Sequence, residues 1–190
     1  MANAAWTVTA VVMVCALMPG ICAAAASNTG VDVVLHVTNY ERISGPELID
    51  AEQEVVKVYS KIGVRLAWAG GVASGAVPDG ARHVDVVILT ADMADRKQPN
   101  AQAFGQASHE TGRAYIYYTR AMAFATKTAS HPKLVLGLVI AHEIGHVLLP
   151  EYSHAPSGLM RAEWDGRIVT IPGFLPTQTQ TIRALLGIEN

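Results

Sequence analysis

Residues 134–148 read LVLGLVIAHEIGHVL, and this stretch decides the fold. Written around a helix, it is apolar on nearly every side, which is typical of a helix at the centre of a domain. Ser130 is expected to cap its first turn, because a serine side chain can accept a hydrogen bond from the free backbone amides there. The helix is expected to end near Leu148, since Pro150 forces the residue before it out of the helical conformation.

Three polar side chains interrupt this apolar helix, namely His142, Glu143 and His146. Burying them is costly unless each finds a partner. Residues four apart lie on one face of a helix, so the two imidazoles point the same way, one turn apart. Two neutral imidazoles at that spacing can bind one zinc ion, with Glu143 near the metal but not placed as a ligand. The alternative is a pair of core histidines held by hydrogen bonds.

A catalytic zinc ion takes three protein ligands and keeps one position for water or substrate. Beyond the proline break the chain soon reaches His154, whose imidazole can return to the metal across a short loop. The competing ligands are Glu163 and Asp165, since some zinc hydrolases use a carboxylate from further along the chain. His154 is the predicted third ligand, and the alternative for it is a surface histidine.

The chemistry predicted from this pattern is hydrolysis of peptide bonds by a zinc-activated water, with Glu143 as general base. The carboxylate takes a proton from the water and later gives it to the leaving amine, while the zinc ion polarises the carbonyl. One alternative is a domain that binds zinc or a partner without hydrolysis, and the intact Glu143 argues against it. Another is hydrolysis of a non-protein or cell-wall amide, because pocket shape decides the substrate.

The rest of the chain alternates between strand and helix patterns, which predicts an α/β (α+β) fold with a mixed sheet. Strands are expected at 31–37, 64–69, 84–90 and 113–119, a short edge strand at 101–108, an amphipathic helix at 46–62 and a closing helix at 177–186. The strand at 84–90 is nearly all apolar and is expected to be buried on both faces. A Gly/Pro-rich loop is expected at 70–80, and irregular structure at 91–100.

The first 26 residues have the pattern of an export signal. Residues 4–18 are almost continuously apolar, a Pro-Gly pair follows, and four alanines ending at Ala26 provide a cleavage point. The alternative is an uncleaved anchor, because about 20 apolar residues can span a bilayer. We therefore expect a secreted or periplasmic catalytic domain at 27–190. Both cysteines lie in the signal, so the mature domain has neither a disulfide nor a cysteine ligand for zinc.

The net charge of −2 and the absence of a basic run give no surface for nucleic acid or for an anionic membrane. The expected partner is a protein or peptide substrate, bound by a monomer. We expect no stable membrane association after the signal is removed.

The stretch HEIGHVLLPEYSHAPSGLM at 142–160 resembles the metzincin clan of zinc proteases, with a matrixin-type catalytic domain. The clan pattern is H-E-x-x-H-x-x-G-x-x-H followed by a methionine turn. The resemblance implies a zincin-like fold, with a mostly parallel sheet packed on two long helices and a small C-terminal subdomain. It also implies that His142, Glu143, His146 and His154 take the clan's roles. Met160 would support the metal from below, and the alternative for Met160 is ordinary core filling.

The chain departs from the clan pattern in the loop after the helix. Leu149 replaces the glycine, and the third histidine comes two residues late, with Tyr152 at the usual position. By the same resemblance, the edge strand at 101–108 would lie along the substrate cleft, where a peptide could add to it. Residues expected to have no metal or substrate role are His36, His83, His109, His131, Tyr115, Tyr117 and Tyr118.

Overall fold

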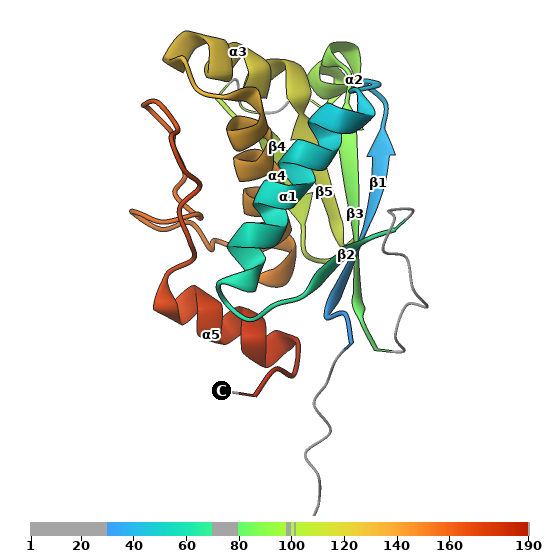
Figure 1. Cartoon of the computed structure of the whole chain (residues 1–190), viewed down its shortest axis with the longest axis vertical. Coiled ribbons are helices and arrows are strands. Elements are labelled where there is room, and N and C mark those ends of the chain that lie inside the picture. The colour runs from blue at the N-terminus through green and yellow to red at the C-terminus, as the bar shows by residue number, and fades with distance from the viewer. Residues whose placement is uncertain (1–29, 70–79, 98–99, 101, 190) are drawn as a thin grey trace, which may run out of the picture.

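The computed structural model describes residues 30–69, 80–97, 100 and 102–189. Its sheet has five strands in the order β2-β1-β3-β5-β4, of which the first four are parallel and β4 runs antiparallel to β5 (Figure 1). The strands are β1 (Val33–Asn39), β2 (Leu66–Trp68), β3 (Arg82–Leu89), β4 (Gly105–Ser108) and β5 (Arg113–Tyr117). The predicted α/β class with a mixed, mostly parallel sheet is therefore confirmed.

Two long helices, α1 and α4, pack against one face of this sheet and against each other (Figure 1). The helices are α1 (Gly45–Ser60), α2 (Ala91–Arg96), α3 (Tyr118–Thr128), α4 (Pro132–Leu148) and α5 (Pro176–Leu185). The buried side chains of α1 recur at helical spacing, at Ala51, Val55 and Tyr59. The Tyr59 hydroxyl donates to the carbonyl of Ala141 at 3.0 Å, which joins α1 to α4 directly before His142.

The helix α4 lies at the centre of the molecule, as its sequence predicts. Nearly every residue from Val135 to Leu148 is buried. Its first turn differs from the prediction, because the cap is His131, whose Nδ1 accepts from the amide of Lys133 at 3.3 Å. The Ser130 hydroxyl instead accepts from the amide of Ile168 at 2.7 Å, so it holds the C-terminal segment rather than the helix.

Two short helices were not predicted from the sequence. Residues 91–96 form α2, in which Thr90 caps the amide of Met93 at 3.3 Å. The helix α3 follows β5 directly; Ala121 and Ala125 are buried, and Tyr118, Met122 and Phe124 pack against the core.

Strand β3 is fully buried on one face but only in part on the other, so the prediction of burial on both faces is wrong for most of the strand. Val84, Val86 and Ile88 point into the core, whereas Asp85 and Val87 between them are half-buried. The long helices α1 and α4 cover the first face, whereas on the other face only Leu89 is buried, in a small cluster with Ala94 of α2.

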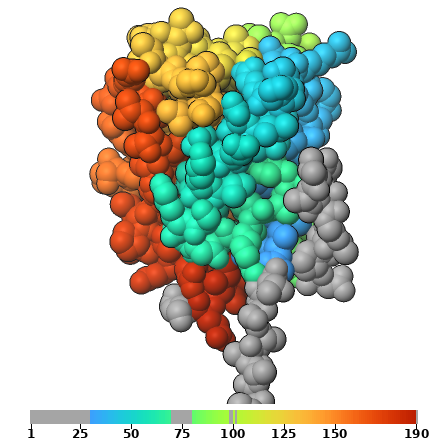
Figure 2. All heavy atoms as spheres, viewed as in Figure 1, coloured from blue at the N-terminus to red at the C-terminus, as the bar shows by residue number. Residues whose placement is uncertain are grey.

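The chain beyond α4 is largely irregular until α5. It borders α1 at the surface of the molecule (orange to red in Figure 2) and contributes Leu159, Ile171 and Ile182 to the same core as the sheet. The C-terminal region therefore shares one core with the strands and long helices. The predicted signal at 1–26 and most of the 70–80 loop lie outside the described residues. Within the described ranges, no helix combines the length and apolar character needed to cross a bilayer.

One buried ion pair fixes the beginning of the sheet. Asp32 is only 8% exposed, and its carboxylate accepts from the Arg65 backbone amide at 2.8 Å and from the Arg65 guanidinium at 3.1 and 2.7 Å. Burial alone would raise the pKa of Asp32, but the hydrogen bonds and charge of Arg65 outweigh it and hold this pKa below its ordinary value.

Asp32→Asn is expected to lower the free energy of unfolding at pH 7 by about 1–3 kcal/mol, because the bonds from the partly buried Arg65 amide and guanidinium to a charged acceptor are weakened or lost. The pKa of Asp32 is lower in the folded state than in the unfolded state. Its contribution is therefore present above the unfolded-state pKa and is lost as pH falls through the folded-state pKa. Urea unfolding of the wild type and of Asp32→Asn should show that their difference in free energy of unfolding disappears in strong acid. The control is Asp50→Asn at an exposed position. A stability difference between wild type and Asp32→Asn that does not change with pH would contradict a lowered pKa for Asp32.

Candidate metal centre

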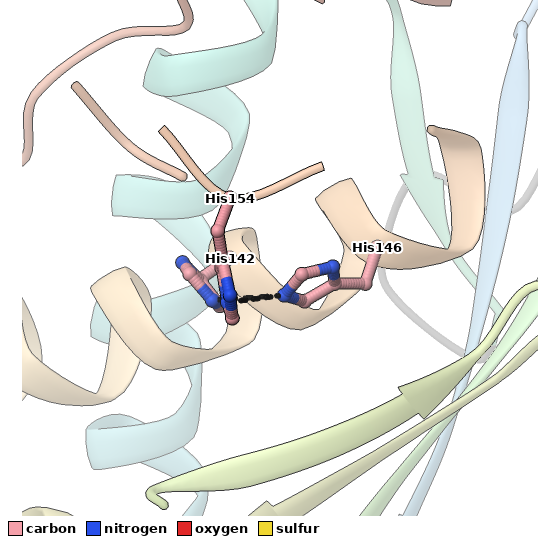
Figure 3. Close-up of side chains that lie close together, drawn as sticks. All are labelled: His142, His146 and His154. Atoms are coloured by element: carbon pink, nitrogen blue, oxygen red, sulfur yellow. Dashed lines mark hydrogen bonds between the residues drawn. The ribbon is translucent and has the colours of Figure 1, made fainter. Parts of the chain in front are cut away.

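Three imidazoles converge at the end of the central helix. His142 and His146 lie one turn apart on α4, and His154 comes from the loop beyond it (Figure 3). The Nε2 atom of His146 lies 3.1 Å from Nε2 of His142 and 3.0 Å from Nε2 of His154. One nitrogen from each ring lies within 4.8 Å of the other two. The sequence-predicted ligands therefore meet at a single point.

The loop that returns His154 begins where the helix stops. Leu149 is extended, at φ −105° and ψ 158°, so the chain leaves the helical path directly before Pro150. Tyr152 then adopts a left-handed conformation at φ +61°, which turns the chain back within a few residues. Ala155 closes the loop, because its amide donates to the Met160 carbonyl at 2.8 Å.

Hydrogen bonds on the far side of the rings set which nitrogen faces the centre. The Nδ1 atom of His142 lies 2.8 Å from the carbonyl oxygen of Leu159. A carbonyl can only accept, so Nδ1 carries the proton and Nε2 presents its lone pair to the other histidines. The Nδ1 atom of His146 lies 3.0 Å from the Ser153 hydroxyl, which can orient that ring in the same way.

The two helical imidazoles are neutral at pH 7. Burial lowers the pKa of His142 to about 4, although its bond to Leu159 acts in the opposite direction. Burial lowers the pKa of His146 to about 3, and the neighbouring His142 and His154 add to the effect. Neutral imidazole is the form that binds a metal ion.

The arrangement fits a zinc ion. With Zn–N bonds of about 2.0–2.1 Å, nitrogens of a tetrahedral site lie about 3.3 Å apart, close to the separations between these rings. Three nitrogen ligands are also the number that leaves a coordination position for a water or substrate. The lone pair that His142 Nε2 presents to the other two rings can bind such a cation. The donor set, the ring orientation and the spacing thus all suit zinc.

The competing carboxylates do not join this group. Among the described residues, the three histidines form the one cluster of three or more metal-binding side chains. Glu163 and Asp165 are exposed, and Asp165 accepts from the Arg161 guanidinium at 3.3 Å. Of the candidates for third ligand, the structure brings only His154 to the other two.

Glu143 is buried beside this cluster and is 6% exposed. Burial raises the pKa of its carboxyl group to about 8. Among the described residues it has no hydrogen bond or ion pair, so its position depends on packing. A buried carboxyl group with a raised pKa, next to a metal-binding cluster, has the character of a general acid–base group.

A cavity of about 540 Å³ opens over these residues. It is lined by β4 with its flanking residues, 102–110, and by the three histidines and Glu143. Strand β4 is at the edge of the sheet, as predicted for part of 101–108, although Ala101 itself lies outside the described residues. Neither Tyr115, Tyr117 nor Tyr118 lines this cavity. Tyr117 is instead buried, and the Tyr118 hydroxyl donates to Glu47 at 2.7 Å.

Met160 is fully buried and packs directly against the backbone of α4. A side-chain carbon placed on Gly145 would lie 2.5 Å from the Met160 sulfur, so only glycine permits this contact. The preceding residue, Leu159, provides the carbonyl that orients His142. The turn ending at Met160 therefore supports the helix that carries two of the histidines.

The sequence did not point to Ser153 or Gln178, which hold the loop. Gln178 lies on α5 and is 9% exposed, and its side-chain amide donates to the Ser153 carbonyl at 3.1 Å. Its side-chain oxygen accepts from the amide of Leu175 at 3.0 Å, so both ends of the group are used. The Ser153 hydroxyl in turn contacts His146. No sequence motif identifies a glutamine whose hydrogen-bond acceptor lies 25 residues away in the chain.

Gln178→Ala is expected to weaken zinc binding about 10–100-fold, as is typical when a group that orients a ligand is removed. The matched control is Gln180→Ala, on the same helix but exposed to solvent. Competition with a chromogenic chelator measures both affinities. Equal affinities in the two variants would show that α5 does not support the loop.

The four remaining histidines lie outside the cluster. His36 and His83 face each other across neighbouring strands, with nitrogens 2.8 Å apart. The Nδ1 atom of His109 lies 2.7 Å from the Val147 carbonyl near the end of α4, and His131 caps the beginning of that helix.

No model of a known protein family matches the chain, and no curated protein matches it. Among solved structures, the fold is similar to that of a zinc-dependent peptidase from Methanocorpusculum labreanum. The two chains are 11% identical, the match covers 81% of this chain and 99% of that chain, and the TM-score is 0.45. Similarity at this level does not identify a family or an activity, so the functional interpretation depends on the histidines, Glu143 and the cavity.

Proposed function

We propose that this chain is a secreted zinc-dependent endopeptidase. The observation that supports it most directly is the convergence of three imidazoles on one point, with a buried carboxyl group beside them in a shared cavity. His142, His146 and His154 are the proposed ligands. The metal supplies a Lewis acid for the substrate carbonyl and an acidified water.

Glu143 is the proposed general base. Its carboxylate accepts a proton from the attacking water as the new C–O bond forms, and returns it to the amine nitrogen as the C–N bond breaks. A carboxyl group whose pKa is raised by burial is suited to both steps, because it can hold and release a proton near neutral pH. Met160 supports the site from beneath α4 and takes no part in the proton transfer.

A peptide is the substrate that the cavity fits best. Strand β4 pairs with β5 on one side, and its other edge belongs to the cavity wall. An extended peptide can add to such an edge through main-chain hydrogen bonds, which brings successive carbonyl groups past the histidines. This favours cleavage within a chain over removal of a terminal residue.

The apolar segment ending at Ala26 supports a location outside the cytoplasm, either secreted or periplasmic. We propose that the domain at 27–190 works there as a monomer without stable membrane association. Its substrate would then be a protein or peptide of the same compartment.

The test is metal analysis of the purified full chain together with mass-spectrometric profiling of a peptide library. We expect one zinc ion per chain, internal cleavage of peptides, and loss of cleavage in a chelator that added zinc reverses. Zinc at one per chain without cleavage of any peptide would replace the proposal with a binding domain. Cleavage confined to cell-wall amides would change the substrate class, and a folded chain without zinc would remove the enzymatic interpretation.

A further inference from the structure

The side chain of Glu143 lies directly against the backbone of β4 at Gly105. A Cβ atom built on Gly105 would lie 2.5 Å from Oε1 of Glu143 and 2.6 Å from both its Cδ and Cγ atoms. Real Cβ atoms essentially never approach other heavy atoms so closely. Any residue larger than glycine at this position therefore requires Glu143 to move.

The backbone conformation gives no reason for a glycine here. Gly105 is the first residue of an ordinary antiparallel strand and is paired with Ile116. Its φ is outside the left-handed range, so an alanine can adopt the same conformation. The space taken by Glu143 is what restricts the position.

The carboxylate has little else to hold it. It has no hydrogen bond or ion pair among the described residues, and Glu143 is only 6% exposed to solvent. Its direction is therefore set by the atoms packed around it, and these include the backbone of β4 at Gly105.

We propose that Gly105 is a positioning residue, which leaves the space in which the Glu143 carboxylate faces the cavity. The inference rests on the proposed function, because it gives Glu143 its role in proton transfer. The atoms that an alanine would meet belong to the outer part of a flexible side chain, which can turn away. The substitution should therefore harm the chemistry far more than the fold.

Gly105→Ala is the test, made in the full chain. We expect one zinc per chain, KM within about threefold of the wild type, and kcat lowered about 100-fold or more, as is typical when a catalytic group is displaced by about 1 Å. The control is Gly166→Ala, since a Cβ at Gly166 meets no atom within 4 Å and its φ is also outside the left-handed range. That variant should keep wild-type kcat.

A second measurement tests the contact between Gly105 and Glu143 without using catalytic activity. In metal-free protein, Gly105→Ala should lower the melting temperature, and it should lower it less when Glu143→Ala has removed the obstructing side chain. The proposal requires both the fall in kcat and this coupling, so either one without the other overturns it. If the wild type lacks zinc and hydrolysis, the proposed function fails, while the coupling still reports whether the two residues touch.

Discussion

Glu143→Gln is expected to lower turnover by about three orders of magnitude while the chain keeps one zinc ion. General acid–base catalysis by a positioned side chain contributes about 10²–10⁴-fold, and glutamine has the same shape without a carboxylate that can accept and return a proton. The loss should fall on kcat rather than KM, because Glu143 is proposed to act on the water and the leaving amine rather than in substrate binding. Steady-state cleavage of a fluorogenic peptide measures this, with metal content determined on the same sample.

Two further glutamates line the same cavity and serve as controls. Glu110→Gln and Glu151→Gln remove the same charge from exposed positions. Both variants should keep kcat close to that of the wild type. Undiminished kcat in Glu143→Gln, in a chain that remains folded, would remove the general-base assignment and favour a binding domain.

His146→Ala is expected to abolish stoichiometric zinc binding. The Nε2 atom of His146 lies within 3.1 Å of both other rings, so this imidazole joins the two others in the cluster. Structural zinc sites with four ligands bind with about 10–16 kcal/mol, or roughly 3 kcal/mol for each ligand. Loss of one ligand should therefore weaken binding at least about 100-fold, and activity should be lost with it.

The matched control for His146 is His83→Ala, which removes an exposed imidazole outside the cluster. Zinc content after dialysis against a weak chelator should stay at one per chain in the control and fall to near zero in His146→Ala. Retention of zinc in His146→Ala would show that the metal binds elsewhere.

Much of the fold follows from local patterns that the sequence displays openly. The apolar run of α4 and the spacing of Ala51, Val55 and Tyr59 in α1 predict both long helices close to their observed bounds. The helix α2 is short and polar, so its amphipathic pattern is weak and its cap at Thr90 is its main signal. The shift of the α4 cap from Ser130 to His131 arises because Ser130 is used by Ile168, 38 residues away.

Some residues of the site could likewise be predicted from local sequence patterns, and others could not. His142 and His146 are predictable because helical spacing alone places them together. His154 could be ranked above Glu163 and Asp165 because it follows the helix break most closely, and the structure places it with the other two. Gly105 and Gln178 could not be found, since each acts through a contact with a segment distant in sequence. A glycine also has no functional group by which sequence analysis could recognise its role.

The hydrogen bond from Gln178 to the Ser153 carbonyl joins α5 to the loop that carries His154. During synthesis, the helix with His142 and His146 is complete more than 25 residues before Gln178 is added. A growing chain can thus present two imidazoles early, but the support for the third arrives only with α5. Metal acquisition should accordingly wait until α5 has been synthesised, and chains that stop before α5 should have a formed sheet and a poorly held ion.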